Sequence, residues 1–554
     1  MFGIRAWWVV TIAVVMALPI LVILGFVFQP FNENWQHLID NLLFEYISNS
    51  LLLMLGVSLG VLSMGIVSAW LTSSCEFPGR RLLSWMLLLP LAIPAYIVAY
   101  TYTGLLDFSG PVQGQLREWF GWGYGDYWFP EVRTLAGAIC MLSLVLYPYV
   151  YMMTRAAFLE QSISVLEASR TLGASPLSGF WAVALPLARP AIIVGVSLAL
   201  METLADYGTV QYFGVSTFTT GIFRTWYGLD DSVTSTQLAS LLLTFVVILI
   251  LLERYSRREA KFHNVSSSRS DAQRFKLSGW RAWLAMIACS LPVVFGFVVP
   301  ASQLLYWTIT TARESLTMSF MGLAANSLLL ATLAALVAVF LALILSYSKR
   351  LLGTKLVRGA VSVSAMGYAI PGTVIAIGVV LPLAWFDNTL DQWLRNTFNV
   401  SSGLLLSGTL FALIFAYTVR FLSVSIQAVD AGLSKIKPSM DDAGRSLGLS
   451  PVGVLRKIHF PLMRGTVLTA LLLVFVDVLK ELPATLILRP FNFNTLAVRA
   501  YEMASDERLA DAGAPALMIV LVGIIPVILL SRSIANSHFK PPSQTLRYQR
   551  GRSS

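Results

Sequence analysis

Five ionisable residues form two groups inside apolar segments of this chain. Glu202 and Asp206 occupy one such segment, and Asp477, Lys480 and Glu481 occupy another. A charge buried in a bilayer costs about 2.5–3.5 kcal/mol on insertion scales, so such residues normally face a bundle interior or a water-filled path. Four acids against one lysine give a formal charge of −3, which suits a hard cation that prefers oxygen ligands. We therefore predict that the five residues line a translocation pathway for a cation.

The helix that carries Glu202 is expected to begin near Arg189, on the inner side of the membrane. At about 1.5 Å per residue, Glu202 and Asp206 would lie ~20 Å and ~26 Å along it, in the outer half of the bilayer. Because they are four residues apart, they would share one helix face. Lys480 would lie within the equivalent second helix. An alternative is that the acids pair with Lys480, Arg224 or backbone donors to hold helices together, or lie in the outer interface.

The elements that position these residues are expected to be membrane helices. The 554-residue chain is 56% hydrophobic and 12% charged, with a mean hydropathy of +0.72, which excludes a soluble protein. A bilayer core about 30 Å thick needs roughly 20 apolar residues per helix. We predict an all-α polytopic membrane protein with about twelve transmembrane helices. The twelve apolar runs are Trp7–Phe28, Ser50–Trp70, Leu83–Leu105, Leu135–Met153, Ala191–Gly214, Leu238–Leu252, Trp283–Ile309, Ser327–Tyr347, Val361–Trp385, Leu404–Leu422, Thr466–Leu488 and Pro515–Leu530.

The distribution of basic residues predicts the orientation. Most of the 39 lysine and arginine residues fall in alternate segments that include both termini, so both termini are predicted to be cytoplasmic. The net charge of +10 then records orientation and not a nucleic-acid partner. A signal peptide is a competing interpretation of the N-terminus, but no small-residue cleavage site follows Phe28, which favours an uncleaved helix. The cysteines and histidines have no ligand spacing, so neither a disulfide framework, a stable metal site nor a cofactor is expected.

An internal repeat organises the chain. The segments NSLLL and AIP occur once in each half, and a charged segment rich in Gly, Ser and Pro recurs further along. Since a unit of six helices returns to its starting side, the two repeats are predicted to be parallel. The aligned pairs are Glu167 with Asp442, Gly173 with Gly448, Pro186 with Pro461, Glu202 with Asp477, and Asp206 with Glu481.

The repeat divides the chain into predicted domains. Residues 1–45 hold the first transmembrane helix and an outer loop, and 46–255 form the first repeated domain. Residues 256–280 are polar, basic and Ser-rich, which is typical of a flexible cytoplasmic linker. The remaining parts are the seventh transmembrane helix with an outer loop (281–320), the second domain (321–535) and a basic cytoplasmic tail (536–554).

Each copy of the charged segment predicts two helices joined by a glycine turn. Gly173 and Gly448 follow good helix formers, where a left-handed C-terminal residue is favoured. Ser175–Pro176 and its counterpart Ser450–Pro451 then supply an N-cap and a first-turn proline. An amphipathic helix here could lie on lipid headgroups. That alternative does not explain identical spacing in both halves, whereas a protein partner with two equivalent sockets does.

The spacing E-A-(x4)-G-(x12)-P of these segments resembles the EAA motif of binding-protein-dependent ABC importer permeases. The resemblance implies the type I permease fold and a coupling helix seated on a cytoplasmic ATPase. The second copy departs from the motif by having aspartate for glutamate. The implied ATPase-coupling residues are Glu167, Ala168, Gly173, Leu185 and Pro186, then Asp442, Ala443, Gly448, Phe460 and Pro461.

The chain has no P-loop, because G-x-x-x-x-G-K-[ST] does not occur in it. The permease is therefore expected not to be an enzyme, and ATP hydrolysis is expected on separate subunits. Two sockets imply two copies of a cytoplasmic ABC ATPase. The family resemblance also implies a periplasmic or lipid-anchored substrate-binding protein and a multi-pass position in a bacterial inner membrane.

The segments ETLADYGTVQYFG and TFTTGIFRTWY resemble the permeases of ferric-iron importers. This resemblance implies ferric iron as the substrate. The same scaffold imports thiamine, phosphonates, sulfate, molybdate or polyamines in related systems, and the acids do not exclude other cations. The competing class is an ion-coupled secondary transporter that would use the acids as proton relays. No nucleophile–base or metal constellation supports a membrane enzyme.

Two further features have open interpretations. The prolines in LPLAIPAYIVAY and MGYAIPGTVIAIG are expected to kink the third helix of each half, for packing or for gating. The aromatic outer loop GWGYGDYWFP is an interface belt or part of a landing surface for the binding protein.

Overall fold

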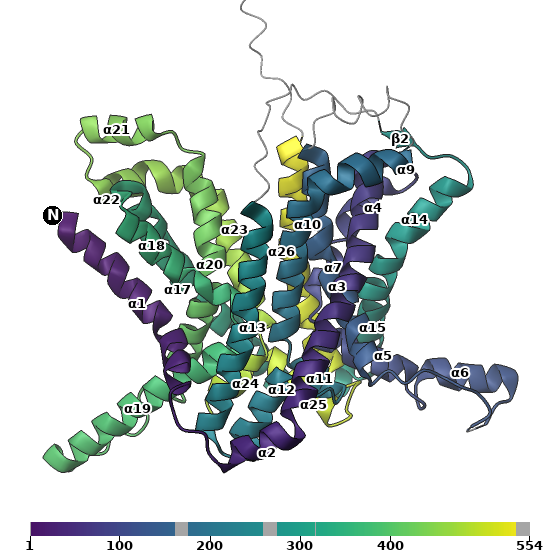
Figure 1. Cartoon of the computed structure of the whole chain (residues 1–554), viewed down its shortest axis with the longest axis horizontal. Coiled ribbons are helices and arrows are strands. Elements are labelled where there is room, and N and C mark those ends of the chain that lie inside the picture. The colour runs from purple at the N-terminus through teal and green to yellow at the C-terminus, as the bar shows by residue number, and fades with distance from the viewer. Residues whose placement is uncertain (1, 124, 161–175, 259–273, 316, 539–554) are drawn as a thin grey trace, which may run out of the picture.

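The computed structural model describes residues 2–123, 125–160, 176–258, 274–315 and 317–538. In this part of the chain the fold is helical, as predicted, and the only strands are a short parallel pair. Strand β1 (Cys75–Glu76) pairs with β2 (Phe275–Lys276). The helices run roughly side by side, with α21 (Pro438–Ser446) and α22 (Pro451–Val454) at one end of the molecule (Figure 1). We call this end the α21 end.

Each of the twelve predicted apolar runs falls on a helix or a broken helix. Ten helices among the described residues are long and apolar enough to cross a membrane, and a pair bent by 93° adds an eleventh span. The apolar part of the last helix, Gly513–Leu529, is shorter. The long helices are α1 (Phe2–Phe26), α3 (Leu43–Ser74), α7 (Leu135–Glu160), α10 (Leu185–Ala205), α13 (Ser232–Arg258), α14 (Trp280–Val293) continued by η4 (Val294–Val298) and α15 (Val299–Thr310), α17 (Met318–Leu352), α19 (Gly372–Phe398), α20 (Leu410–Ser434), α23 (Phe460–Leu479) and α26 (Gly513–His538).

Shorter elements connect these spans. At the end opposite α21 they are α2 (Glu33–Asn41), α6 (Pro111–Phe120), α11 (Gly208–Tyr212), α12 (Phe218–Phe223), η3 (Arg224–Gly228), α16 (Ala312–Ser315), α24 (Pro483–Leu488) and α25 (Leu496–Ser505). At the α21 end, α9 (Pro176–Gly179) and η2 (Phe180–Ala184) precede α10, and η6 (Leu455–His459) precedes α23.

The two halves have the same three-helix core. Helices α3, α7 and α10 pack against one another in the first half, as α17, α20 and α23 do in the second. Small residues allow the close approach of α3 and α7. A Cβ atom at Gly60 would lie 2.2 Å from the Ser143 hydroxyl, and one at Gly65 would lie 2.7 Å from Val150. Such contacts replace the hydrophobic driving force that membrane helices lack.

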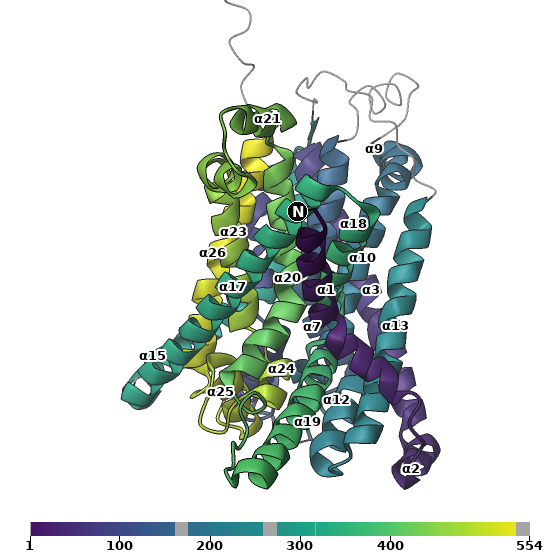
Figure 2. The ribbon, with the colours of Figure 1, turned by 90° about the vertical axis from the view of Figure 1, so that its left-hand side faces the viewer.

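The first helix of each half packs against the other half. Helix α1 contacts α17, α18 (Lys355–Ser364) and α19, and Figure 2 shows it lying across them. Helices α14 and α15 correspondingly contact α3, α4 (Arg80–Met86) and α5 (Ala95–Leu106). These reciprocal contacts hold the two halves together at the outside of their three-helix cores.

The predicted proline breaks are confirmed in the third span of each half. Pro94 separates η1 (Leu89–Ala92) from α5, and Pro371 separates η5 (Met366–Ala369) from α19. The residues before the prolines, Ile93 and Ile370, are extended, with ψ angles of 122° and 131°, because a following proline disfavours the helical region.

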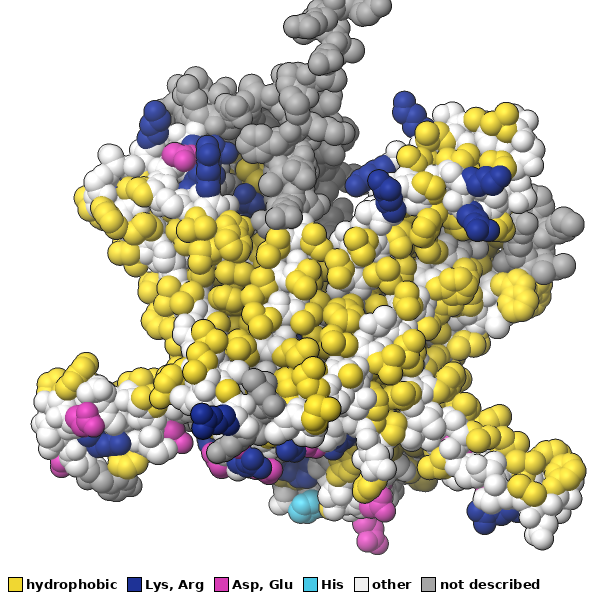
Figure 3. Space-filling view, turned by 180° about the vertical axis from the view of Figure 1, so that it is seen from behind, with side chains coloured by type: hydrophobic (Ala, Val, Ile, Leu, Met, Phe, Trp, Pro, Cys, Tyr) yellow, Lys and Arg dark blue, Asp and Glu magenta, His cyan; other side chains and the backbone are white. Residues whose placement is uncertain are grey.

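An apolar band separates two polar ends. Figure 3 shows hydrophobic side chains over the middle of the molecule and charged side chains gathered toward both ends. The beginning of α1 and the last described turn of α26 both lie toward the α21 end (Figure 1). This agrees with an even number of spans if the shorter α26 is counted as the twelfth. That this end faces the cytoplasm remains a prediction from the basic residues. The linker residues 259–273 and the tail residues 539–554 lie outside the described residues.

Candidate functional site

The helices that carry the intramembrane acids end earlier than predicted. Helix α10 ends at Ala205, and Asp206 is extended, with φ −67° and ψ 130°. The prediction that Asp206 shares a helix face with Glu202 is therefore wrong. Helix α23 likewise ends at Leu479, so Lys480 and Glu481 follow the helix and do not lie within it. The physical reason is that Asp206 and Glu481 bond to the backbone of the next helix, which competes with continuing the first one.

Asp206 and Glu481 perform the same local role in the two halves. Asp206 Oδ2 accepts hydrogen bonds from the backbone N–H groups of Thr209 and Val210, each at 3.1 Å, at the start of α11. Glu481 accepts from the N–H groups of Ala484 and Thr485, also at 3.1 Å, at the start of α24. Each acid thus satisfies two donors that a helix N-terminus leaves without partners.

Glu481 also forms a buried ion pair that the sequence analysis did not foresee. Arg420 Nη1 lies 2.8 Å from Glu481 Oε1, and the two side chains are only 9% and 2% exposed. Arg420 is close to the end of the predicted run Leu404–Leu422, but α20 continues to Ser434, which places Arg420 well inside the helix. Gly372 makes room for the pair, since a Cβ atom there would lie 2.1 Å from Arg420 Nη1.

All five predicted pathway residues line one cavity between the halves. Its volume is about 130 Å³, and its polar lining comes from Glu202, Asp206, Asp477, Lys480, Glu481, Arg420, Tyr96, Tyr149, Tyr207 and Tyr368. With Arg420 included, the ionisable side chains have a formal charge of −2, which corrects the predicted −3. The cavity lies where α10 and α23 end, toward the end of the molecule opposite α21 (Figure 1).

The cavity acids differ in their partners. Asp477 pairs with Lys480 at 2.9 Å, and Asp206 and Glu481 bond as described above. Glu202 has no hydrogen-bond or ion-pair partner among the described residues. The alternative interpretation, that the acids bond to groups within the protein, therefore holds for Asp206, Asp477 and Glu481 but not for Glu202. Arg224 takes no part in it, since its Nη1 donates to the Tyr46 hydroxyl at 3.4 Å.

The second copy of the repeated segment has the predicted helix, glycine turn and helix. Helix α21 ends in two reversed hydrogen bonds, from Gly448 N–H to Arg445 O at 2.9 Å and from Leu449 N–H to Gly444 O at 3.0 Å. This is the Schellman pattern, and Gly448 takes the left-handed φ of +79° that it requires. The Ser450 hydroxyl then accepts from Gly453 N–H at 3.2 Å and caps α22.

The helix after the glycine turn is continuous with the membrane span, whereas the predicted apolar run begins only at Thr466. From Pro451 the chain stays helical to Leu479, through the wide π-helical turn η6. The turn η2 occupies the aligned position in the first half. Each turn immediately precedes the motif's last two residues, Leu185–Pro186 and Phe460–Pro461. A proline cannot donate to the residue four before it, which explains the wide turn at this joint.

Much of the first copy lies outside the described residues. This applies to Glu167, Ala168 and Gly173. The described part begins at Pro176, which starts α9 as predicted. Beyond it, Phe180 packs against Trp70, with ring centroids 5.0 Å apart.

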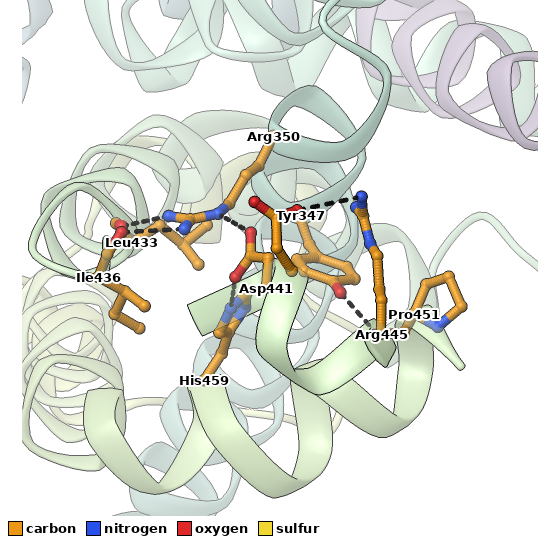
Figure 4. A network of polar contacts seen from close by, with 9 residues as sticks. Tyr347, Arg350, Leu433, Ile436, Asp441, Arg445, Pro451 and His459 are labelled. Carbon is orange, nitrogen blue, oxygen red and sulfur yellow. Dashed lines mark hydrogen bonds and ion pairs between the residues drawn. The ribbon is translucent and has the colours of Figure 1, made fainter. Parts of the chain in front are cut away.

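A buried polar network fixes the second copy to its own half (Figure 4). Asp441 Oδ2 accepts from Arg350 Nε at 2.8 Å, and Asp441 Oδ1 lies 2.5 Å from His459 Nε2. The Arg350 guanidinium also donates to the carbonyls of Leu433 and Ile436 at the end of α20. One guanidinium thus joins α17, α20 and α21.

The electrostatics of Asp441 match this geometry. Burial raises the pKa of Asp441, but hydrogen bonds from Arg350 and His459 outweigh burial and hold the pKa below its ordinary value. The aspartate is therefore ionised at neutral pH. The Tyr347 hydroxyl adds a further link by donating to Pro451 O at 2.6 Å. The sequence analysis did not identify this network, because its members are far apart in the chain.

The predicted coupling residues of this copy lie mainly on the outside of the loop. Asp442 is 74% exposed in its side chain, and Ala443, Gly448, Phe460 and Pro461 are also exposed. Three apolar side chains share this exposure, Met440, Leu447 and Val452, with Leu447 82% exposed. The buried carboxylate is thus Asp441, next to the motif residue Asp442, which faces solvent.

Comparison with known proteins identifies the family. The sequence model described as "binding-protein-dependent transport system inner membrane component" matches residues 62–260 and 338–540. The chain belongs to this family. It is thus a multi-pass inner-membrane component of a transport system that works with a binding protein, and the two matches confirm the predicted duplication.

Several relatives of this transport permease are named for the substrates that they transport. The chain is 28% identical over 492 residues to the Fe(3+)-transport system permease protein FbpB 2 of Haemophilus influenzae, covering 88% of this chain and 90% of that protein. It is 25% identical over 511 residues to the ferric transport system permease protein FbpB of Actinobacillus pleuropneumoniae, covering 86% and 70%. A shorter match, 33% over 152 residues, links 27% of this chain to 63% of the molybdenum transport system permease protein ModB of Escherichia coli K12.

Proposed function

We propose that this permease carries ferric iron, delivered by a periplasmic binding protein, across the inner membrane. The observation that carries the proposal is the net-acidic cavity between the halves, lined by four carboxylates and four tyrosines. Hard cations prefer such oxygen ligands. The similarity to two permeases named for ferric transport, along most of the chain, supports the same substrate. An oxyanion such as molybdate fits a cavity of formal charge −2 poorly.

We further propose that two copies of a separate ABC ATPase supply the energy. Their sockets would be the exposed α21–α22 loop and its counterpart in the first half, including Glu167, Ala168 and Gly173. In the second half, α22, η6 and α23 form one continuous helix from Pro451 to Leu479, and Glu481 follows its end. A displacement of the loop would therefore be transmitted through this helix to Glu481 and the cavity. ATP binding would close the ATPases, draw the loops together and open the cavity outward.

Uptake of radioactive ferric iron into proteoliposomes tests the proposal. The permease would be reconstituted with its ATPase, with ATP inside the vesicles and the iron-loaded binding protein outside. We expect uptake that needs ATP and the binding protein and that persists when the proton gradient is collapsed. Thiamine, phosphonate and molybdate, each offered with the same components, serve as substrate controls.

Two results would contradict the proposal. Transport of one of the control solutes without transport of iron would refute the substrate. Uptake that continues without ATP and stops when the proton gradient is collapsed would favour the ion-coupled secondary transporter.

A further inference from the structure

Most polar groups of the cavity already have partners within the protein. Asp206 and Glu481 cap α11 and α24, Glu481 also pairs with Arg420, and Asp477 pairs with Lys480. A cargo that bound these groups would have to break a helix cap or a buried ion pair. They are therefore poorly suited to hold a passing ion, and they are better described as the frame of the cavity.

Of the remaining polar groups, we call four the phenol cluster: Glu202, Tyr96, Tyr149 and Tyr368. Tyr96 is 5% exposed, yet its hydroxyl has no partner among the described residues although Tyr96 lines the cavity. The side chains of Tyr149 and Tyr368 lie close to each other, and both lie within electrostatic reach of Glu202. No hydrogen bond or ion pair joins the Glu202 carboxylate to another described residue, although Lys480 lies within electrostatic reach of it.

The phenol cluster is assembled from both halves of the chain. Tyr96 belongs to α5, Tyr149 to α7 and Glu202 to α10, all in the first half. Tyr368 belongs to η5 in the second half. A movement that separates the halves would therefore separate Tyr368 from the other three side chains.

We propose that the phenol cluster is a transient binding site for a ferric ion, with the Glu202 carboxylate and tyrosine oxygens as ligands. The inference rests on the proposed function. A trivalent hard cation prefers charged oxygens, and tyrosinate is an established ligand of ferric iron in haem proteins. Each phenol that binds the ion releases its proton to water in the cavity. When the halves separate, Tyr368 leaves the coordination shell, which lowers the affinity and releases the ion.

The size of the cavity defines the form of the cargo. Pockets for organic ligands usually measure about 300–1,000 Å³, whereas this cavity measures about 130 Å³. About 10–15 Å³ of such volume is enough for one water molecule, so the cavity has room for an ion with a shell of waters. The site would thus take iron without an organic chelator.

Visible absorption spectroscopy tests the site directly, because tyrosinate bound to Fe³⁺ gives a charge-transfer band. The purified full-length permease would be titrated with ferric nitrilotriacetate. We expect a band that saturates with iron and disappears in the double variant Tyr149→Phe, Tyr368→Phe. Glu202→Gln should weaken iron binding by at least about tenfold, as the loss of metal-site groups generally does.

Matched controls come from the same helices. Tyr147 on α7 and Tyr100 on α5 are buried, and their hydroxyls also lack partners among the described residues, but neither lines the cavity. Tyr147→Phe and Tyr100→Phe should therefore keep the band. Gel filtration would show that each variant is folded, and phenylalanine preserves the packing of every ring.

The outcomes separate this inference from the proposed function. A band that is unchanged in the double variant would show adventitious iron only and would overturn the site. Absence of any band, with ATP-driven iron uptake intact, would overturn the site and leave the proposed function standing. Failure of iron uptake together with transport of another solute would refute the proposed function itself.

Discussion

Replacing Arg350 with methionine is expected to abolish transport while leaving the membrane spans inserted. Arg350 and Asp441 are 18% and 11% exposed in their side chains, and Arg350 also donates to the carbonyls of Leu433 in α20 and of Ile436 just after it. Removing one partner of a buried pair costs about 3–5 kcal/mol, and the Asp441 carboxylate would keep only its contact with His459. The loss would fall on the α21 loop, which would detach from α17 and α20. ATP-driven uptake in proteoliposomes and limited proteolysis of the loop measure the two effects.

The adjacent residue provides the control for this variant. Lys349 pairs with Asp430 at 2.7 Å, but the two side chains are 40% and 32% exposed. Exposed pairs contribute at most about 1 kcal/mol, so Lys349→Met should leave uptake and proteolysis nearly unchanged. If the two variants lost uptake equally, the effect would come from the loss of a positive charge at the α21 end. It would not come from the Asp441 network.

The Asp441 network also predicts a dependence on pH. Because the pKa of Asp441 is lowered in the folded protein, the network stabilises the loop above the unfolded aspartate value of about 3.9. This stabilisation is lost as the pH falls through the lower folded value.

Replacing Glu481 with glutamine is expected to destabilise the whole permease. Arg420 would remain buried at 9% exposure without its carboxylate, at a cost of about 3–5 kcal/mol. Combining Glu481→Gln with Arg420→Met should recover part of this loss, because no unpaired charge then remains. Thermal unfolding of the purified variants would measure both changes. Asp511→Asn is the control, since its partner Arg508 is 58% exposed and the pair should contribute little.

If Glu481→Gln were as stable as the parent protein and only slowed iron uptake, our description of Glu481 as part of the frame would be wrong. The acid would then act on the cargo directly, as the sequence alone had suggested. If the destabilisation of the double variant equalled the sum of the two single effects, Glu481 and Arg420 would not be strongly coupled.

The spans, the duplication and the location of the site were predictable because they depend on local composition. A charge such as Glu202 in an apolar run must face a polar interior, wherever the helix lies. The roles of the acids were not predictable, because they depend on where a helix ends. Asp206 could continue α10 or cap α11, and tertiary packing decides for the cap.

The coupling loop shows the same division between local and distant information. The turn at Gly448 follows from its own sequence, Gly then Ser-Pro. The network around Asp441 depends on Arg350, which lies far away in the chain and only meets the loop when α17 and α20 pack together. One residue separates the exposed Asp442 from the buried Asp441, and the motif spacing alone could not distinguish their environments.

Site-specific photocrosslinking at Leu447 tests the central claim, that ATPases act on this permease through its α21–α22 loop. Leu447 is 82% exposed at the α21 end. In the intact transporter we predict an adduct with the nucleotide-hydrolysing subunit and none from Leu404, which is 60% exposed at the opposite end. Adducts from Leu447 to lipid alone, in a transporter that still imports its substrate, would contradict the account.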